Sequence, residues 1–181
     1  MNRWMLLVLA WLSVHAWAAE FELSSTDIQA GQMMGKAQEF NGFGCSGGNQ
    51  SPQLSWRNPP PGTQSFAVTV YDPDAPTGSG WWHWVVFDLP ANVRSLPANA
   101  GDPTATLLPA GAVQSRTDYG KGGFGGACPP QGHGKHRYQF TVYALKVPSL
   151  QLDADSSAAL VGFMLNANTL GKAQLEALYE R

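Results

Sequence analysis

Three segments of the chain have the apolar, β-branched and aromatic content of buried strands. They are residues 66–71 (FAVTVY), 81–89 (WWHWVVFDL) and 136–145 (HRYQFTVYAL). Residues of these types fit a pleated, half-buried surface. The first segment ends at Asp72–Pro76, where two prolines cannot continue a central ladder. The pattern therefore predicts a mostly β domain built around these three strands.

The remaining sequence predicts shorter and less regular elements. Weak alternation predicts two early strands within 20–29 and 31–40, and residues 51–56 read as extended. Glycine-rich sequence predicts loops at 41–49 and 120–134. Residues 90–111 are rich in Gly, Pro and Ala, which predicts a long irregular connection with a short strand near Leu107.

Counting with a period of two sorts the strongest strands into faces. The count predicts one face with Trp81, His83, Val85 and Phe87 and the opposite face with Trp82, Trp84 and Val86. In the last strand it groups His136, Tyr138, Phe140 and Val142. Each of these two strands thus carries a histidine near its start, and Asp72 ends the first strand. Polar residues at strand ends beside glycine-rich loops are where binding sites on rigid sheets commonly form.

Composition supports the β class, and one segment has the pattern of a helix. The chain has 20 glycines, 13 prolines and only 13% charged residues, which favours turns and short strands. Residues 153–168 are the exception, because Asp and Ser stand at the start of an apolar row with helical spacing. The row is Leu160, Phe163, Met164 and Ala167.

The net charge is −2 and there is no basic cluster, which argues against nucleic acid as a partner.

The N-terminus has the three parts of a secretory signal. A cationic start ending at Arg3 precedes an apolar stretch, residues 4–14, and the small-residue pattern Ala16-Trp17-Ala18. The alternative is a membrane anchor, but this apolar stretch is well short of the roughly 20 residues that cross a bilayer. We therefore predict a signal peptide at 1–18, a single domain at 19–181, no stable membrane insertion, and a periplasmic or secreted protein.

The two cysteines are consistent with export. Cys45 and Cys128 are the only ones in the chain and lie far apart in the sequence. In an oxidising compartment, such a pair is most simply interpreted as one disulfide. The alternative is two buried free thiols. A disulfide would bring the two glycine-rich loops together, with Cα atoms within about 7 Å.

Several motifs in this chain resemble those of one known family. They are Asp72–Pro76 (DPDAP), Gly80–Trp84 (GWWHW), Gly126–Pro130 (GACPP) and the His136-Arg137-Tyr138 triplet that follows Gly134. In this order they resemble the phosphatidylethanolamine-binding proteins, also called Raf-kinase-inhibitor-like proteins. Within the family, the resemblance is to the bacterial YbhB/YbcL branch and its exported YbcL-like members. Residues 51–56 and 160–179 fit as well, so the resemblance spans nearly all of the predicted mature chain.

The resemblance implies a fold and a ligand class. The fold is an antiparallel β-sandwich with one or two peripheral helices near the C-terminus. The implied ligand is a small anion or phosphorylated head group. For the protein we expect no cofactor and no metal, a possible homodimer, and a protein partner whose identity is unknown. Carried over residue by residue, the pocket consists of Asp72, Trp81, His83, Gly126, Cys128, Pro130, His136 and Tyr138.

The residue types at these positions suit an oxyanion. Two imidazoles and a tyrosine hydroxyl can donate hydrogen bonds, and a nearby carboxylate such as Asp72 favours the charged form of an imidazole. Backbone N–H groups of a glycine-rich loop can add donors. Trp81 and Pro130 would form apolar walls. We therefore expect a binding protein rather than an enzyme.

Three other functions remain open from the residues alone. Asp72, His83 and His136 could serve a hydrolase or lyase as orienting carboxylate, acid and base. The same three side chains could hold zinc with an open position, although they lack any short local spacing. The domain could also act through its surface, as an inhibitor of another protein.

Overall fold

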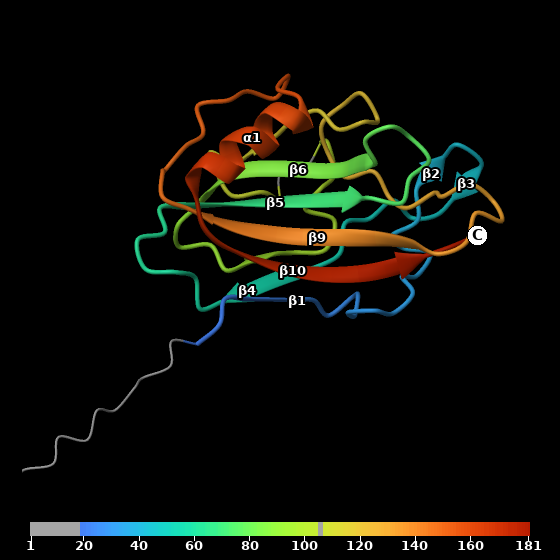
Figure 1. Ribbon diagram of the computed structural model, residues 1–181, viewed down its shortest axis with the longest axis horizontal. Helices are drawn as coiled ribbons and strands as arrows, with labels where there is room; N and C mark the ends of the chain where they lie inside the picture. The colour runs from blue at the N-terminus through green and yellow to red at the C-terminus, as the bar shows by residue number, and fades with distance from the viewer. Residues whose placement is uncertain (1–18, 105–106) are drawn as a thin grey trace, which may run out of the picture.

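The computed structural model describes residues 19–104 and 107–181 of the chain, so the predicted signal peptide lies outside the described residues. It has two main antiparallel sheets and one helix (Figure 1). The smaller sheet has the order β1-β4-β7, and the larger has the order β10-β9-β5-β6-β8. The elements are β1 Glu22–Ser24, β2 Asn41–Gly42, β3 Cys45–Ser46, β4 Leu54–Arg57, β5 Ser65–Asp72, β6 Trp81–Pro90, β7 Ser95–Leu96, β8 Val113–Gln114, β9 His136–Leu145, α1 Ala158–Asn168 and β10 Thr169–Tyr179.

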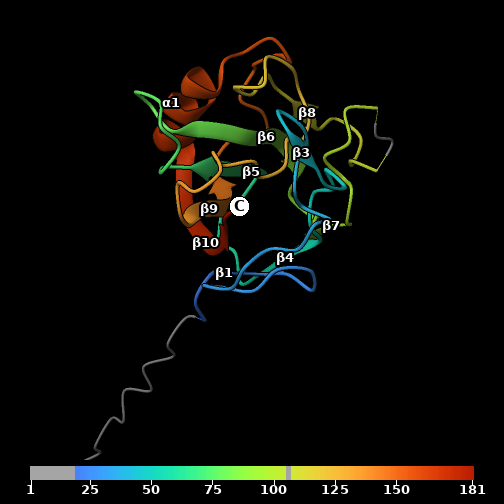
Figure 2. The same ribbon diagram turned by 90° about the vertical axis from the view of Figure 1, so that its right-hand side faces the viewer.

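The inner strands β5 and β6 of the larger sheet are buried on both faces, which explains why they are apolar over most of their length. One face packs against the smaller sheet through a core that includes Phe66, Val68 and Phe140. The other face packs against α1, where Val161 and Leu165 are buried. Figure 2 shows α1 on one side of β5 and β6, with β4 and β7 on the other. The predicted mostly β class and antiparallel sandwich are confirmed.

A β-bulge in β6 makes part of the face prediction wrong. Val70 and Tyr71 of β5 pair with Trp84 and Trp82, so His83 has no partner on β5. One extra residue in a strand reverses the alternation beyond it. Trp84 and Val86 face the core shared with the smaller sheet, and Trp81 and His83, at the start of β6, line a cavity on the same side. Trp82, Val85 and Phe87 face α1. The grouping predicted for β9 is confirmed, because Tyr138, Phe140 and Val142 share one core.

The C-terminal strand β10 was not predicted. It pairs with β9 over almost its whole length, from Tyr179 opposite His136 to Thr169 opposite Leu145. Its sequence, TLGKAQLEALY, has few β-branched residues, so propensity alone gives a weak signal there. Pairing with β9 and burial of Ala173, Leu175 and Ala177 override that propensity.

Two weaker strand predictions need correction. Residues 31–40 contain no strand: the N–H groups of Gln38 and Glu39 bond back to Gly35 and Lys36 in turns. The described residues from 107 onward first form a strand at Val113–Gln114 rather than near Leu107.

The helix also starts later than predicted. Residues 153–156 form a turn in which the Ser156 hydroxyl bonds to Asp153, and Ser157 is the N-cap, accepting from the N–H of Leu160 at 3.2 Å. The residues that α1 buries are Ala158, Val161 and Leu165, whereas Leu160 and Phe163 of the predicted apolar row are exposed. No helix among the described residues is long and apolar enough to cross a bilayer.

Candidate functional site

Antiparallel pairing gathers the predicted site at one edge of the larger sheet. The last residue of β5 and the first residues of β6 and β9 lie there, because β5 runs opposite to both neighbours. Figure 1 shows this edge at the right, beside β2, β3 and the C-terminus. A cavity of about 200 Å³ opens at this edge. It is lined by Phe43, Asp72, Ala75, Pro76, Thr77, Trp81, His83, Tyr119, Cys128, Pro129, Pro130, His136 and Tyr138.

Asp72 and His136 form a buried pair in this cavity. Nδ1 of His136 lies 2.7 Å from Oδ2 of Asp72, and both side chains are less than 5% exposed. A carboxylate accepts, so Nδ1 of His136 carries the proton that is donated to it. The other oxygen of Asp72 accepts the N–H of Asp74 at 2.8 Å. The imidazole of His136 is therefore fixed in orientation, and Nε2 is the ring nitrogen that Asp72 does not hold.

Asp74 holds the turn that follows β5 through an ion pair near the surface. Its two carboxylate oxygens accept from Nε and Nη2 of Arg137 at 2.9 and 2.7 Å, a bidentate arrangement. The hydrogen bond from Arg137 lowers the pKa of Asp74. Because Arg137 follows His136 directly, this ion pair ties the end of β5 to the start of β9. The two acidic residues of the DPD sequence thus have different roles, with Asp72 in the cavity and Asp74 on the surface.

His83 differs from His136 in its hydrogen bonding. Its Nδ1 lies 2.7 Å from the carbonyl oxygen of Gly125, which only accepts, so Nδ1 donates. Burial lowers the pKa of His83, which favours the neutral ring with an accepting Nε2. The expectation that both imidazoles donate to an oxyanion therefore needs correction for His83. This ring suits a ligand that carries a hydroxyl, such as a protonated phosphate.

Tyr138 provides an unpaired polar group. Its hydroxyl is buried and has no hydrogen-bond partner among the described residues, although the ring packs edge-on against His83. Burial raises the pKa of Tyr138, so the phenol keeps its proton. An unpaired buried hydroxyl costs free energy, which a ligand oxygen at this position would recover.

Gly126 is the one predicted pocket residue that does not line the cavity. Its N–H donates to Oδ1 of Asn49 at 2.8 Å, and its carbonyl accepts from the Tyr119 hydroxyl at 2.9 Å. A Cβ at this position would lie 2.3 Å from the carbonyl oxygen of Gln38, so only glycine fits. The prediction that its N–H binds an anion is therefore corrected: Gly126 supports the wall of the cavity.

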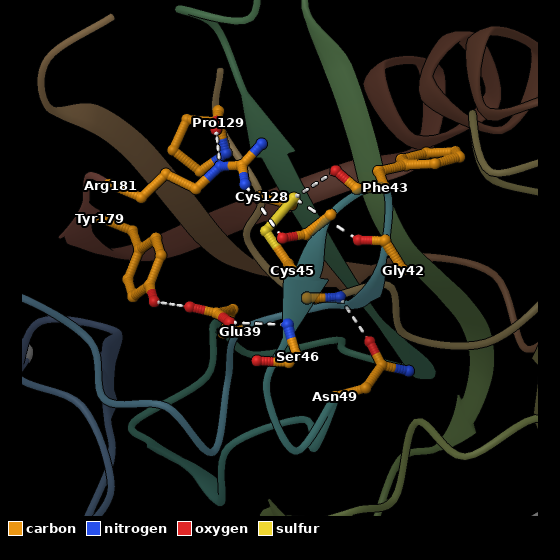
Figure 3. Close-up of a disulfide and its surroundings, with 12 residues drawn as sticks. Glu39, Gly42, Phe43, Cys45, Ser46, Asn49, Cys128, Pro129, Tyr179 and Arg181 are labelled. Atoms are coloured by element: carbon orange, nitrogen blue, oxygen red, sulfur yellow. Dashed lines mark hydrogen bonds between the residues drawn. A yellow bond between two sulfur atoms is a disulfide. The ribbon is translucent and has the colours of Figure 1, made fainter. Parts of the chain in front are cut away.

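A disulfide joins the two glycine-rich loops at the cavity rim, as predicted. Cys45 and Cys128 are bonded, with Cα atoms 6.0 Å apart. Figure 3 shows the guanidinium of Arg181 beside this bond, where it donates to the carbonyl oxygen of Pro129. The guanidinium also donates to the carbonyl oxygen of Gly44. The end of the chain therefore bridges the same two loops as the disulfide, and both hold the Cys128–Pro130 wall in place.

Sequence reasoning missed six residues of the lining. Ala75 and Pro76 belong to the DPDAP motif, and Thr77 and Pro129 adjoin quoted motifs, so adjacency was an available signal. Tyr119 begins the glycine-rich loop before Cys128, and Phe43 is the lone aromatic residue between glycines in the other loop. Phe43 is 70% exposed and stacks on Tyr119, with ring centroids 5.8 Å apart. A lone aromatic residue in a glycine-rich loop is a signal that could have found it.

The fold and the site define an antiparallel β-sandwich protein with a small, partly polar cavity at one edge of its main sheet. Residues 24–180 match the family described as phosphatidylethanolamine-binding protein. The chain belongs to the phosphatidylethanolamine-binding protein family, as the motifs predicted.

Individual relatives agree with this assignment. The chain is 55% identical to YbcL of Escherichia coli (strain K12) over 173 residues, which cover 96% of this chain and 94% of YbcL. It is 48% identical to YbhB of the same strain over 158 residues, 87% of this chain and 99% of YbhB. The crystal structure of E. coli YbcL, described as a new member of the mammalian PEBP family, matches with a TM-score of 0.89 and 56% identity. That match covers 90% of this chain and 99% of the YbcL chain.

Proposed function

We propose that this chain is an exported binding protein for a small anionic or phosphorylated ligand, and not an enzyme. The observation that carries the proposal is the buried Asp72–His136 pair beside the unpaired hydroxyl of Tyr138 in one cavity. In its imidazolium form His136 donates from Nε2–H, and Tyr138 donates from O–H, and both donors suit an oxyanion. Membership of the family supports a ligand-binding protein of this type.

The size and walls of the cavity limit what enters it. A volume of about 200 Å³ is below the roughly 300 Å³ at which pockets for drug-sized molecules begin. Trp81, Pro76 and Pro130 form apolar walls around the polar base. These features favour a phosphate, a carboxylate or a compact phosphorylated head group whose remaining atoms extend through the mouth.

The surroundings of the hydroxyl groups support binding without chemistry. Among the described residues that line the cavity, Thr77 carries the one hydroxyl besides those of the two tyrosines. This hydroxyl donates to the carbonyl of Gly80 rather than to a histidine. Gly44–Gly48 matches the G-x-S-x-G nucleophile pattern, but its Ser46 belongs to the short β2–β3 hairpin and lies outside the cavity lining. In hydrolases that use this pattern, the serine sits on a strand-to-helix turn. No such turn is present at Ser46.

The disulfide supports export. Disulfides persist in oxidising compartments and are rare in the cytosol. The Cys45–Cys128 bond thus agrees with the signal-like sequence at residues 1–18. We propose the periplasm or the exterior of the cell as the place of action.

Replacing His136 with alanine should weaken binding of inorganic phosphate by about tenfold or more. A hydrogen bond to a charged group contributes about 1.5 to 3 kcal/mol, and 1.4 kcal/mol corresponds to a factor of ten. Isothermal titration calorimetry on His136→Ala measures the effect. Gln139→Ala is the matched control, because Gln139 lies on the same strand but bonds to Glu176 on the opposite face. Equal affinity of a folded His136→Ala variant and the wild type would contradict the assigned site.

Replacing Asp72 with asparagine tests how the carboxylate acts. Asp72 repels an anion, but it also holds Nδ1 of His136 and therefore aims Nε2 into the cavity. Because the carboxylate contacts the ring directly, we expect orientation to dominate and phosphate affinity to fall by about tenfold in Asp72→Asn. Phosphate titrations of the two proteins measure this. Tighter binding by Asp72→Asn would show that repulsion dominates and would contradict the positioning role.

A further inference from the structure

We infer that His133 is a displaceable cap on the anion site, an inference that rests on the proposed function. Nδ1 of His133 lies 2.7 Å from Nε2 of His136. The other ring nitrogen of His136 is held by Asp72, so Nε2 is the one ring nitrogen with which His136 can bind a ligand. His133 occupies that atom. A ligand that bonds to Nε2 must therefore displace the ring of His133.

The two histidines differ in how firmly they are held. His136 is 1% exposed at the start of β9, whereas His133 is exposed on the turn before it. Gly132 and Gly134 flank His133 with φ values of 75° and 90°. A Cβ at either glycine would meet nothing within 4 Å, so the space around this turn is open. The ring of His133 can thus rotate toward solvent without disturbing the core.

Few hydrogen bonds hold the turn itself. The N–H of Gly132 donates to the carbonyl of Arg181 at 2.8 Å, and the N–H of His133 donates to the carbonyl of Pro130 at 3.1 Å. Both bonds use backbone atoms, so they remain when the side chain of His133 moves. The cap is therefore a side chain on an anchored turn, and Nε2 of His136 is its one side-chain partner among the described residues. A single hydrogen bond between two imidazoles is weak enough for a charged ligand to replace.

Removing the cap should strengthen phosphate binding. We expect His133→Ala to bind inorganic phosphate about three- to tenfold more tightly, since one net hydrogen bond need no longer be broken. Isothermal titration calorimetry of the full chain measures the dissociation constant. Gln131→Ala is the matched control: it removes a side chain of similar size from the same turn, and Gln131 does not line the cavity. This control should bind phosphate as the wild type does.

Nitrogen NMR of the His136 ring gives a second readout. Without phosphate, the Nε2 signal of His136 should shift in His133→Ala and stay unchanged in Gln131→Ala. Equal or weaker phosphate binding by His133→Ala, with the wild type still binding, would overturn the cap and leave the proposed function in place. An unchanged Nε2 signal in His133→Ala would overturn it as well. Failure of all three proteins to bind phosphate would instead contradict the proposed function and with it the cap.

Discussion

Replacing both Cys45 and Cys128 with serine should lower the free energy of unfolding by about 4 kcal/mol. The bond joins residues 83 apart in sequence, and in the chain-entropy account a loop of this length restricts the unfolded chain by about that amount. Folded domains are stable by only about 5 to 15 kcal/mol, so this loss is a large part of the total. Urea unfolding of the two proteins, followed by tryptophan fluorescence, measures it.

Two controls separate the disulfide from the loss of the two side chains. Wild-type protein unfolded in the presence of a reductant should show the same reduced stability as the double variant. Reductant should have no effect on the double variant, because it contains no other cysteine. A loss below about 1 kcal/mol would show that Arg181, which bonds to both loops, holds them together without the covalent bond.

The strand ends explain why so much of the site could be predicted from sequence. Asp72 closes β5 and His136 opens β9, and two antiparallel neighbours necessarily bring such positions to one edge. Period-two counting also groups Tyr138 with His136, because β9 pairs with β10 without a register shift from His136 to Ala144. Local patterns thus sufficed wherever the ladder was regular.

The bulge at His83 shows where such counting fails. Its extra residue appears only in the pairing between β5 and β6, and the sequence WWHWVV does not show which residue lacks a partner. Trp81 and His83 precede the change in alternation, so they still share one face of β6, and both line the cavity. What changes is the core beyond it, where Trp84 replaces Val85 on the inner face.

The contacts between distant loops could not be predicted for a different reason. Gly126 belongs to the GACPP motif, which predicted a place in the pocket. Its N–H instead bonds to Asn49, which is 77 residues away in sequence. The sequence does not single out His133, because a histidine between glycines has no periodicity to interpret. Its role depends on a 2.7 Å contact with His136, which only the shape of the turn creates.

Glu39 is a second place where distant segments meet. Its side chain is 2% exposed and accepts from Nζ of Lys36 at 2.6 Å and from the N–H of Ser46 at 3.0 Å. The hydroxyl of Tyr179, at the end of β10, also donates to it (Figure 3). Burial alone would raise the pKa of Glu39, but the hydrogen bonds from Lys36, Tyr179 and Ser46 lower it from 4.5 to about 2. Burial and the bond to Glu39 raise the pKa of Tyr179 to about 12, so the phenol stays a donor.

Replacing Glu39 with glutamine should therefore remove an acid-sensitive part of the stability. A carboxyl whose pKa is lower in the folded chain stabilises it above pH 4.5, and that contribution disappears as pH falls through about 2. We expect a loss of about 2 to 3 kcal/mol at pH 7, allowing for solvent screening of the exposed Lys36. Urea unfolding between pH 7 and 2.5 should show that the difference in unfolding free energy between wild type and Glu39→Gln decreases as pH decreases.

Glu22→Gln, which breaks the exposed pair with Arg57, is the control and should cost less than about 1 kcal/mol. Parallel pH profiles for Glu39→Gln and the wild type would mean that the carboxylate of Glu39 does not hold the end of β10 against β3.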